Sequence, residues 1–127
     1  MNLAQQIGMT ADEAASLGRL AADLMAAGDP AGACLLLEGL TVLNPDDAMN
    51  WAALGVAHHA AGNTEQAEAS YRECLKRDAA CVTALAYLGE LLLGRGEPEG
   101  RKLVQTAMAD VTFAASDAGQ RLARIAR

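Results

Sequence analysis

The residues of this sequence that could perform chemistry are three cysteines and two histidines. The number of cysteines is odd, and Cys34, Cys74 and Cys81 form neither a CxxC pair nor a spacing with histidine that suits zinc. His58 and His59 are adjacent, so on a helix their side chains diverge by about 100° and cannot bind one metal ion together. We therefore expect thiols that act as small core side chains in a reducing compartment.

The remaining polar residues form no pattern typical of an enzyme. The sequence contains no Ser, His and Asp arrangement, no glycine-rich phosphate loop and no paired-carboxylate motif. Its glycines are explained as turns between helices. We expect no catalytic residue, no metal site and no cofactor, and hence a protein that is not an enzyme.

The elements that position these side chains are expected to be helices. The 127 residues include 29 Ala and 18 Leu, but only 7 Val or Ile and 4 aromatic residues. Alanine and leucine are strong helix formers, whereas strands need β-branched and aromatic side chains. With 12 Gly and only 3 Pro, the chain is expected to form several short helices that end at glycines. The composition predicts one all-α domain.

The charge of the chain excludes some classes of partner. The net charge is −6 and the pI is about 4.7, which argues against binding of nucleic acid. The N-terminus has no basic, apolar leader, and apolar runs such as Leu91 to Leu93 are too short to cross a bilayer. We expect a cytoplasmic protein without membrane insertion.

The chain repeats itself with a period of 34 residues. Six kinds of residue recur at fixed positions along the chain. Their order is a large residue, a leucine, a small residue, a turn glycine, an alanine and a second large residue. In the third unit Arg101 replaces the small residue near the start of the second helix. The matching residues are Trp51, Leu54, Gly55, Gly62, Ala67 and Tyr71 in the central unit, Leu17, Leu20, Ala21, Gly28, Ala33 and Leu37 before it, and Leu85, Leu88, Gly89 and Gly96 after it.

This pattern resembles the tetratricopeptide repeat (TPR), in which each unit is a helix, a turn and an antiparallel helix. The resemblance implies an all-α solenoid in a single domain, residues 1–127, with three units at about 14–47, 48–81 and 82–113 and a capping helix at about 115–127. Thr10 and Glu13 form a capping box at the start of the first helix. Seven helices are expected, at about 11–27, 30–43, 47–61, 64–77, 79–94, 98–110 and 116–127.

In TPR proteins the first helix of each unit lines a concave groove, at positions 2, 5, 9 and 12 of the unit. The implied groove has no Lys or Arg, which disfavours recognition of a free C-terminal carboxylate. Its small apolar lining is typical of a site for an apolar segment of a partner protein, either extended or helical. The implied partner-binding residues are Ala15, Gly18, Ala22 and Met25 in the first unit, Met49, Ala52, Val56 and His59 in the second, and Thr83, Ala86, Glu90 and Leu93 in the third.

Five positions of the repeat separate packing roles from binding roles. Trp51, Tyr71 and His58 fall at positions that pack inside the repeat, so we expect them in the core. His59 falls at a groove position, where it could bond a peptide carbonyl or respond to pH. Glu90 is the one charge in an otherwise apolar lining.

The order of elements, the acidic charge and the short closing helix resemble the small class II chaperones of type III secretion. The resemblance lies in Ala48 to Cys81 and in the following Ala84 to Glu90. It implies a non-catalytic chaperone that holds an apolar segment of a translocator in its groove. Chaperones of needle or export-apparatus subunits, which are equally short, are an open alternative, so the partner is either a secretion substrate or an apparatus subunit.

A different function is also open from the sequence alone. The apolar face could be covered by the chain's own N-terminal or C-terminal segment or by a second copy of the chain. In that case the protein would be a TPR scaffold or assembly subunit that forms a homo-oligomer through the same face.

Overall fold

The computed structural model describes residues 1–125, and within that range the chain forms nine helices and no strand. The predicted all-α solenoid is confirmed. The helices are α1 (Leu3–Gln6), α2 (Ala11–Ala26), α3 (Pro30–Leu43), α4 (Ala48–Ala60), α5 (Thr64–Arg77), α6 (Val82–Gly94), α7 (Glu99–Met108), α8 (Val111–Ala115) and α9 (Asp117–Ile125).

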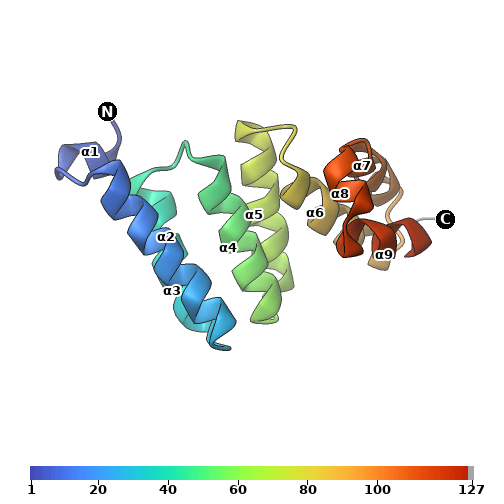
Figure 1. Ribbon diagram of the computed structural model, residues 1–127, viewed down its shortest axis with the longest axis horizontal. Coiled ribbons are helices and arrows are strands. Elements are labelled where there is room, and N and C mark those ends of the chain that lie inside the picture. The colour runs from blue at the N-terminus through green and yellow to red at the C-terminus, as the bar shows by residue number, and fades with distance from the viewer. Residues whose placement is uncertain (126–127) are drawn as a thin grey trace.

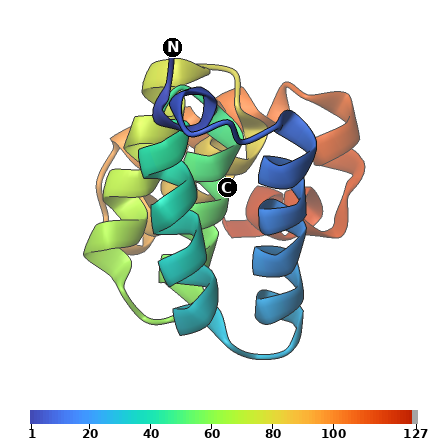
Figure 2. The ribbon, with the colours of Figure 1, turned by 90° about the vertical axis from the view of Figure 1, so that its left-hand side faces the viewer.

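Successive antiparallel pairs stack along the long axis of the molecule (Figure 1). The pairs are α2–α3, α4–α5 and α6–α7. In each of the first two pairs, the first helix lies nearer the viewer of Figure 1 and the second lies behind it. Figure 2, seen from the N-terminal end, shows α2 and α3 side by side with α1 above them. The first helices therefore share one face of the solenoid, and the second helices share the opposite face.

The turn inside each pair depends on a glycine. Gly28, Gly62 and Gly96 stand 34 residues apart and have φ angles of 82°, 83° and 75°. This left-handed backbone is costly for residues with a Cβ and is readily adopted by glycine. The repeat period therefore has a direct structural cause, since the same turn occurs three times at the same position of the unit.

The third unit packs its second helix through Gly100 rather than through the repeat position occupied by Arg101. Gly100 is buried, whereas Arg101 is exposed. A Cβ built on Gly100 would lie 2.6 Å from the backbone N of Leu93 and 2.7 Å from the carbonyl O of Gly89. The small residue that permits close helix approach has thus moved by one position, which lets α6 and α7 keep a tight crossing while Arg101 faces solvent.

The prediction of seven helices was wrong at the two ends of the chain. At the N-terminus, Asn2 and Gln5 form a capping box that supports α1, a single turn. At the C-terminus, α7 ends at Met108, and Asp110 caps the five-residue α8 by accepting a hydrogen bond from Phe113 N. The last two residues of the predicted capping helix, 126 and 127, lie outside the described residues.

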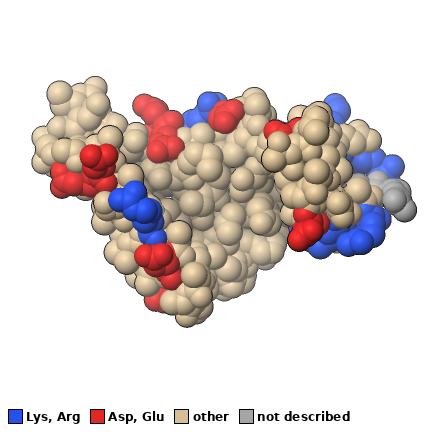
Figure 3. All heavy atoms as spheres, in the orientation of Figure 1, with Lys and Arg blue, Asp and Glu red and all other residues tan. Residues whose placement is uncertain are grey.

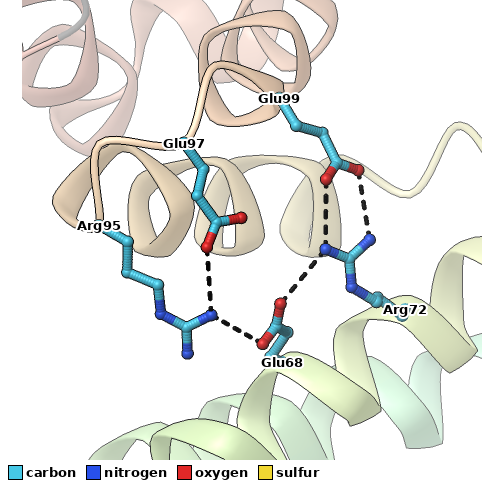
Figure 4. A network of polar contacts seen from close by, with 5 residues as sticks. All are labelled: Glu68, Arg72, Arg95, Glu97 and Glu99. Atoms are coloured by element: carbon cyan, nitrogen blue, oxygen red, sulfur yellow. Dashed lines mark hydrogen bonds and ion pairs between the residues drawn. The ribbon is translucent and has the colours of Figure 1, made fainter.

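A network of ion pairs joins the second unit to the third (Figure 4). Arg72 on α5 donates to both carboxylate oxygens of Glu99 at 3.2 and 3.3 Å and to Glu68 at 3.2 Å. Arg95, at the end of α6, donates to the other oxygen of Glu68 at 2.8 Å and lies 3.9 Å from Glu97. Hydrogen bonding from Arg95, and then from Arg72, holds the pKa of Glu68 below its ordinary range.

Replacing Glu68 with glutamine is expected to lower the free energy of unfolding by about 0.5–1 kcal/mol at neutral pH. A carboxylate with a depressed folded-state pKa adds stability above its unfolded-state pKa, and this stability is lost as the pH falls through the folded-state value. The difference between wild type and Glu68→Gln should therefore be constant above about pH 5 and shrink below about pH 4.3. Urea unfolding from pH 7 to pH 2.5 measures it, and a difference that grows toward low pH would contradict this assignment.

Among residues 1–125, no helix has both the length and the apolar character needed to cross a membrane.

Candidate partner-binding groove

An apolar pocket opens between α2 and α4 on the face of the first helices. We call it the N-terminal pocket, and its volume is about 440 Å³. None of its lining residues is charged, and Asn50 is the one polar side chain among them. In Figure 3 the middle of this face carries no charged atoms, and the charged atoms lie on α2, along the upper edge and over the C-terminal helices. The lining residues are Gly18, Ala21, Ala22, Met25, Leu37, Met49, Asn50, Ala53 and Val56.

The N-terminal pocket brings together five of the predicted groove residues, from two helices. Its width comes from short side chains, because glycine and alanine occupy most of the α2 wall. The two methionines supply flexible, polarizable contact surface that can adapt to different side chains. Ala15 lies beside this pocket, in a smaller depression of about 210 Å³ near the start of α2. The five residues are Gly18, Ala22, Met25, Met49 and Val56.

A second pocket lies at the other end of the face, between α6 and the C-terminal helices. This C-terminal pocket has a volume of about 190 Å³. It brings together the predicted residues Thr83, Ala86 and Glu90 and closes them in with α8 and α9. Leu122 is 1 % exposed and packs with Ala86 in one core cluster. The lining residues are Thr83, Ala86, Tyr87, Glu90, Phe113, Ser116, Ala118, Arg121 and Leu122.

The one charge predicted in the groove has a partner in the structure. The guanidinium of Arg121 on α9 donates to both carboxylate oxygens of Glu90, with one of the two bonds at 3.1 Å. Glu90 in turn raises the pKa of Arg121. The C-terminal end of the face is therefore covered by the chain itself and neutral at its rim, whereas the N-terminal pocket is open.

Ala52 requires a correction to the predicted groove. It is 1 % exposed and lies in the core cluster with Tyr71, Cys74 and Leu88. The next residue, Ala53, is exposed and lines the N-terminal pocket instead. Consecutive helical residues point about 100° apart, so a shift of one position moves a side chain from the groove into the core.

His59 and Leu93 line neither of these two pockets. His59 is exposed near the end of α4. Leu93 is half-buried and packs against the core cluster that α6 shares with α7 and α9. The structure thus separates the predicted set into residues of the open pocket, residues under the C-terminal helices and residues outside both.

Several pocket residues were not predicted from the sequence. Among them, Ala53 could have been found from its helical spacing. Met49, Ala53 and Val56 stand at i, i+4 and i+7, the spacing of one helix face. Tyr87 occupies the equivalent position of the third unit, 34 residues after Ala53. By contrast, nothing local indicates that Phe113 and Arg121 would fold back onto α6.

The residues predicted to lie in the core do so. Tyr71 is fully buried and its ring stacks on Tyr87, with ring centroids 6.0 Å apart. Trp51 is half-buried between two core clusters and donates its Nε1–H to the carbonyl O of Pro45 at 2.8 Å. The guanidinium of Arg77 lies 4.7 Å from the Trp51 ring. These aromatic side chains hold the repeat together and do not face the groove pockets, with the exception of Tyr87.

His58 is buried and belongs to a polar cluster between α3 and α4. Its Nδ1 lies 3.5 Å from Cys34 Sγ and 3.3 Å from Asn63 Nδ2, and its Nε2 lies 3.5 Å from a carboxylate oxygen of Glu38. In a row of cysteine, histidine and carboxylate, the histidine can activate the cysteine thiol as a nucleophile. Here Cys34 is buried, and burial together with Glu38 raises its pKa. A protonated, inaccessible thiol packs rather than reacts.

Between residues 1 and 125, no three His, Cys, Asp or Glu side chains come together in a group that could hold a metal ion. The face carries two pockets, one open and apolar and one closed by α8 and α9.

Solved structures of type III secretion proteins, among them a translocator chaperone, are similar to this chain over almost its whole length. No family model and no curated protein matches the sequence. A type III secretion complex from Aeromonas hydrophila contains a chain with 26% sequence identity and a TM-score of 0.82, over 99% of this chain and 83% of that one.

Two further solved structures extend the same likeness. PcrH, a protein of Pseudomonas aeruginosa, bound to the chaperone-binding region of PopB, has 27% identity and a TM-score of 0.76, over 94% of this chain and 95% of that one. The translocator chaperone SycD of Yersinia enterocolitica has 23% identity and a TM-score of 0.81, over 98% and 93% of the two chains, a likeness of fold. The predicted resemblance to class II chaperones is confirmed by these structures.

Proposed function

We propose that this protein is a non-catalytic, cytoplasmic chaperone that holds an apolar segment of a type III secretion translocator in its groove. PcrH is bound to the chaperone-binding regions of PopB and PopD in solved structures, and SycD is bound to a peptide of YopD. These relatives support a translocator as the partner rather than a needle or export-apparatus subunit.

The observation that carries the proposal is the open, uncharged N-terminal pocket. A pocket of about 440 Å³ that is lined by glycine, alanine, methionine, valine and leucine offers room for a large apolar side chain. Moving such a side chain out of water contributes about 1.5–3 kcal/mol. A translocator segment that must enter a membrane carries such side chains, and sequestering them in the groove would prevent their aggregation before export.

The partner segment is proposed to lie along the face of α2, α4 and α6. Its main anchor would enter the N-terminal pocket, between Met25 on α2 and Met49 on α4. Beyond α4 the segment would reach α6, where the paired Glu90 and Arg121 and the C-terminal helices limit its further course. An extended segment suits this path because its exposed backbone can accept hydrogen bonds from groove side chains such as Asn50.

A binding titration with defined peptides tests the proposal. The probes are the chaperone-binding regions of PopB and PopD, each compared with a copy in which the apolar residues are replaced by aspartate. We expect saturable binding of one unmodified peptide per chain, with affinity reduced at least about 100-fold for the aspartate copies. Failure of both unmodified peptides to bind, or equal binding of the aspartate copies, would contradict the proposal.

The size of the protein in the same experiment separates this function from a self-assembling scaffold. If the groove is closed by a second copy, the peptides should compete with self-association and dissociate the oligomer. If the groove is free, the peptides should bind without changing the number of chains per particle.

A further inference from the structure

The N-terminal pocket continues into a channel along α2. It shares Gly18 and Asn50 with a second depression of about 210 Å³, which lies between the start of α2 and the start of α4. That depression shares Ala11, Ala14 and Asn44 with a third one of about 130 Å³, which ends at α1. We call the second and third depressions together the N-terminal channel. The open pocket therefore has an extension toward α1 in addition to its course toward α6.

The two walls of the N-terminal channel differ in their chemistry. The α2 wall consists of small side chains, which are alanines from Ala11 onward and Gly18 where the channel meets the pocket. The opposite wall is polar and comes from the end of α3 and the start of α4, with Asn44, Asp47 and Asn50. The channel is thus apolar on one side and polar on the other, whereas the N-terminal pocket is apolar on both sides.

The length of the channel is set by α2 and by the position of α1. Asn2 on the N-terminal side of α1 donates its side-chain Nδ2–H to Asn44 Oδ1 at 3.1 Å, and this bond holds α1 at the end of the channel. Between Gly18 and Ala11 the helix rises by about 10 Å, at about 1.5 Å per residue. An extended chain covers that distance with about three residues. The channel therefore has room for about three residues that directly flank a side chain bound in the N-terminal pocket.

The charge of the channel indicates which side chain it would hold. Asp47 is the one charged residue among the described residues that line it. Lysine and arginine bury their aliphatic stems along apolar surface while the charged group stays in a polar environment. Such a stem fits along the alanines of α2, with its cation at the carboxylate of Asp47. Residues 1–47 contain seven acidic residues and one basic residue, so the surrounding field also attracts a cation.

We propose that the N-terminal channel binds the flank of the partner segment next to its apolar anchor, and that Asp47 selects a lysine or arginine in that flank. This inference rests on the proposed function, in which the anchor enters the N-terminal pocket. Asn50 lines both the pocket and the channel, so its side-chain amide is placed to bond the backbone of the segment between anchor and flank. The channel thus gives the segment a direction, with the basic flank toward α1 and the other flank toward α6.

A charge scan of a peptide tests the selection. The probe is the chaperone-binding region of PopD, and its anchor is the apolar residue whose replacement by alanine costs the most affinity. Lysine or glutamate is placed in turn at each of the about three positions on either side of this anchor, and isothermal titration measures each affinity. We expect lysine to bind about 5- to 10-fold tighter than glutamate on one side, and less than about 2-fold tighter on the other, because one flank alone enters the channel.

Asp47→Asn separates the charge of Asp47 from its structural role. Asp47 caps α4 by accepting a hydrogen bond from Met49 N at 3.0 Å, and asparagine is an equally good capping residue. The preference for lysine should fall below about 2-fold in this variant, because the charge is lost while the helix start is kept. The matched control is Asp46→Asn, which removes the neighbouring exposed carboxylate that does not line the channel. It should keep the preference, and circular dichroism of both variants establishes that the helices are retained.

The methyl resonance of Met9 reports on the path of the segment independently of charge. Met9 lines the end of the channel beside α1. Binding of the peptide with its full basic-side flank should shift the Met9 resonance together with those of Met25 and Met49. A peptide shortened to the anchor on that side should still shift Met25 and Met49, because they line the pocket, but should leave Met9 unchanged.

Two results would overturn this proposal without affecting the proposed chaperone function. The first is binding that shifts Met25 and Met49 but shows no charge preference on either side of the anchor. The second is a preference for lysine that survives Asp47→Asn, or that is lost equally in Asp46→Asn, since the selecting group would then not be Asp47. Failure of every peptide to bind would instead contradict the proposed function itself, and the inference about the channel would fall with it.

Discussion

Replacing Tyr71 with alanine is expected to lower the free energy of unfolding by about 3–5 kcal/mol. The Tyr71 side chain is fully buried between the second and third units. Its ring stacks on Tyr87 with an interplanar angle of 9°. It also fills the space beside Gly55, where an added Cβ would lie 2.4 Å from the Tyr71 ring. Truncation therefore removes a contact between three helices and leaves a cavity beside the close approach of α5 to Gly55 on α4.

The matched control is Tyr71→Phe, which keeps the ring and removes the hydroxyl. Among the described residues the Tyr71 hydroxyl is buried without a hydrogen-bond partner. Removing an unsatisfied polar atom costs little and can stabilise a protein, so Tyr71→Phe should unfold at the wild-type urea concentration or slightly above it. Urea denaturation followed by circular dichroism measures both variants. A loss below about 1 kcal/mol for Tyr71→Ala, or an equal loss for Tyr71→Phe, would show that the ring does not hold the units together.

Replacing Ala53 with arginine is expected to weaken binding of an apolar translocator segment at least about 100-fold without unfolding the protein. Ala53 is exposed on α4 and lines the N-terminal pocket between Met25 and Met49. A guanidinium at this position fills the opening and places a charge where the apolar anchor of the segment would be buried. Ala69→Arg, at an exposed position of α5, makes the same change outside the groove and should bind normally.

Ala52→Arg supplies the opposite control. Because Ala52 is 1 % exposed in the core, an arginine there should unfold or strongly destabilise the chain rather than block the groove alone. Isothermal titration with the PopD chaperone-binding region measures binding, and circular dichroism measures the fold. Unchanged affinity of a folded Ala53→Arg variant would place the binding site elsewhere.

The architecture could be predicted because the repeat leaves strong signals in the sequence. Gly28, Gly62 and Gly96 mark the turn of each unit, and their positive φ angles explain why no other residue recurs there. Small residues such as Gly55 mark the helix crossings. Thr10 and Glu13 mark the start of α2, and the structure contains the capping box that they predict.

The details of the groove were harder to predict because they depend on the rotation of each helix about its axis. Ala52 and Ala53 are chemically identical, so residue type gives no indication of which one faces the groove, and only the helical spacing of Ala53 with Met49 and Val56 distinguishes them. The fold of the C-terminus onto α6 depends on contacts distant in sequence, such as Arg121 with Glu90. Likewise, the replacement of one small residue by Arg101 was visible, but the compensating role of Gly100 follows only from the tight crossing of α6 and α7.

The five methionines of the chain provide the most direct test of whether the open, apolar face of α2 and α4 binds a translocator segment. Methyl NMR of methionine-labelled protein should be recorded while the PopD chaperone-binding region is added. We predict that the methyl resonances of Met25 and Met49 shift and saturate together, because both side chains line the N-terminal pocket. The methyl resonance of Met108, which packs in the C-terminal core, should not shift. Binding of the peptide with Met25 and Met49 unmoved would contradict this account.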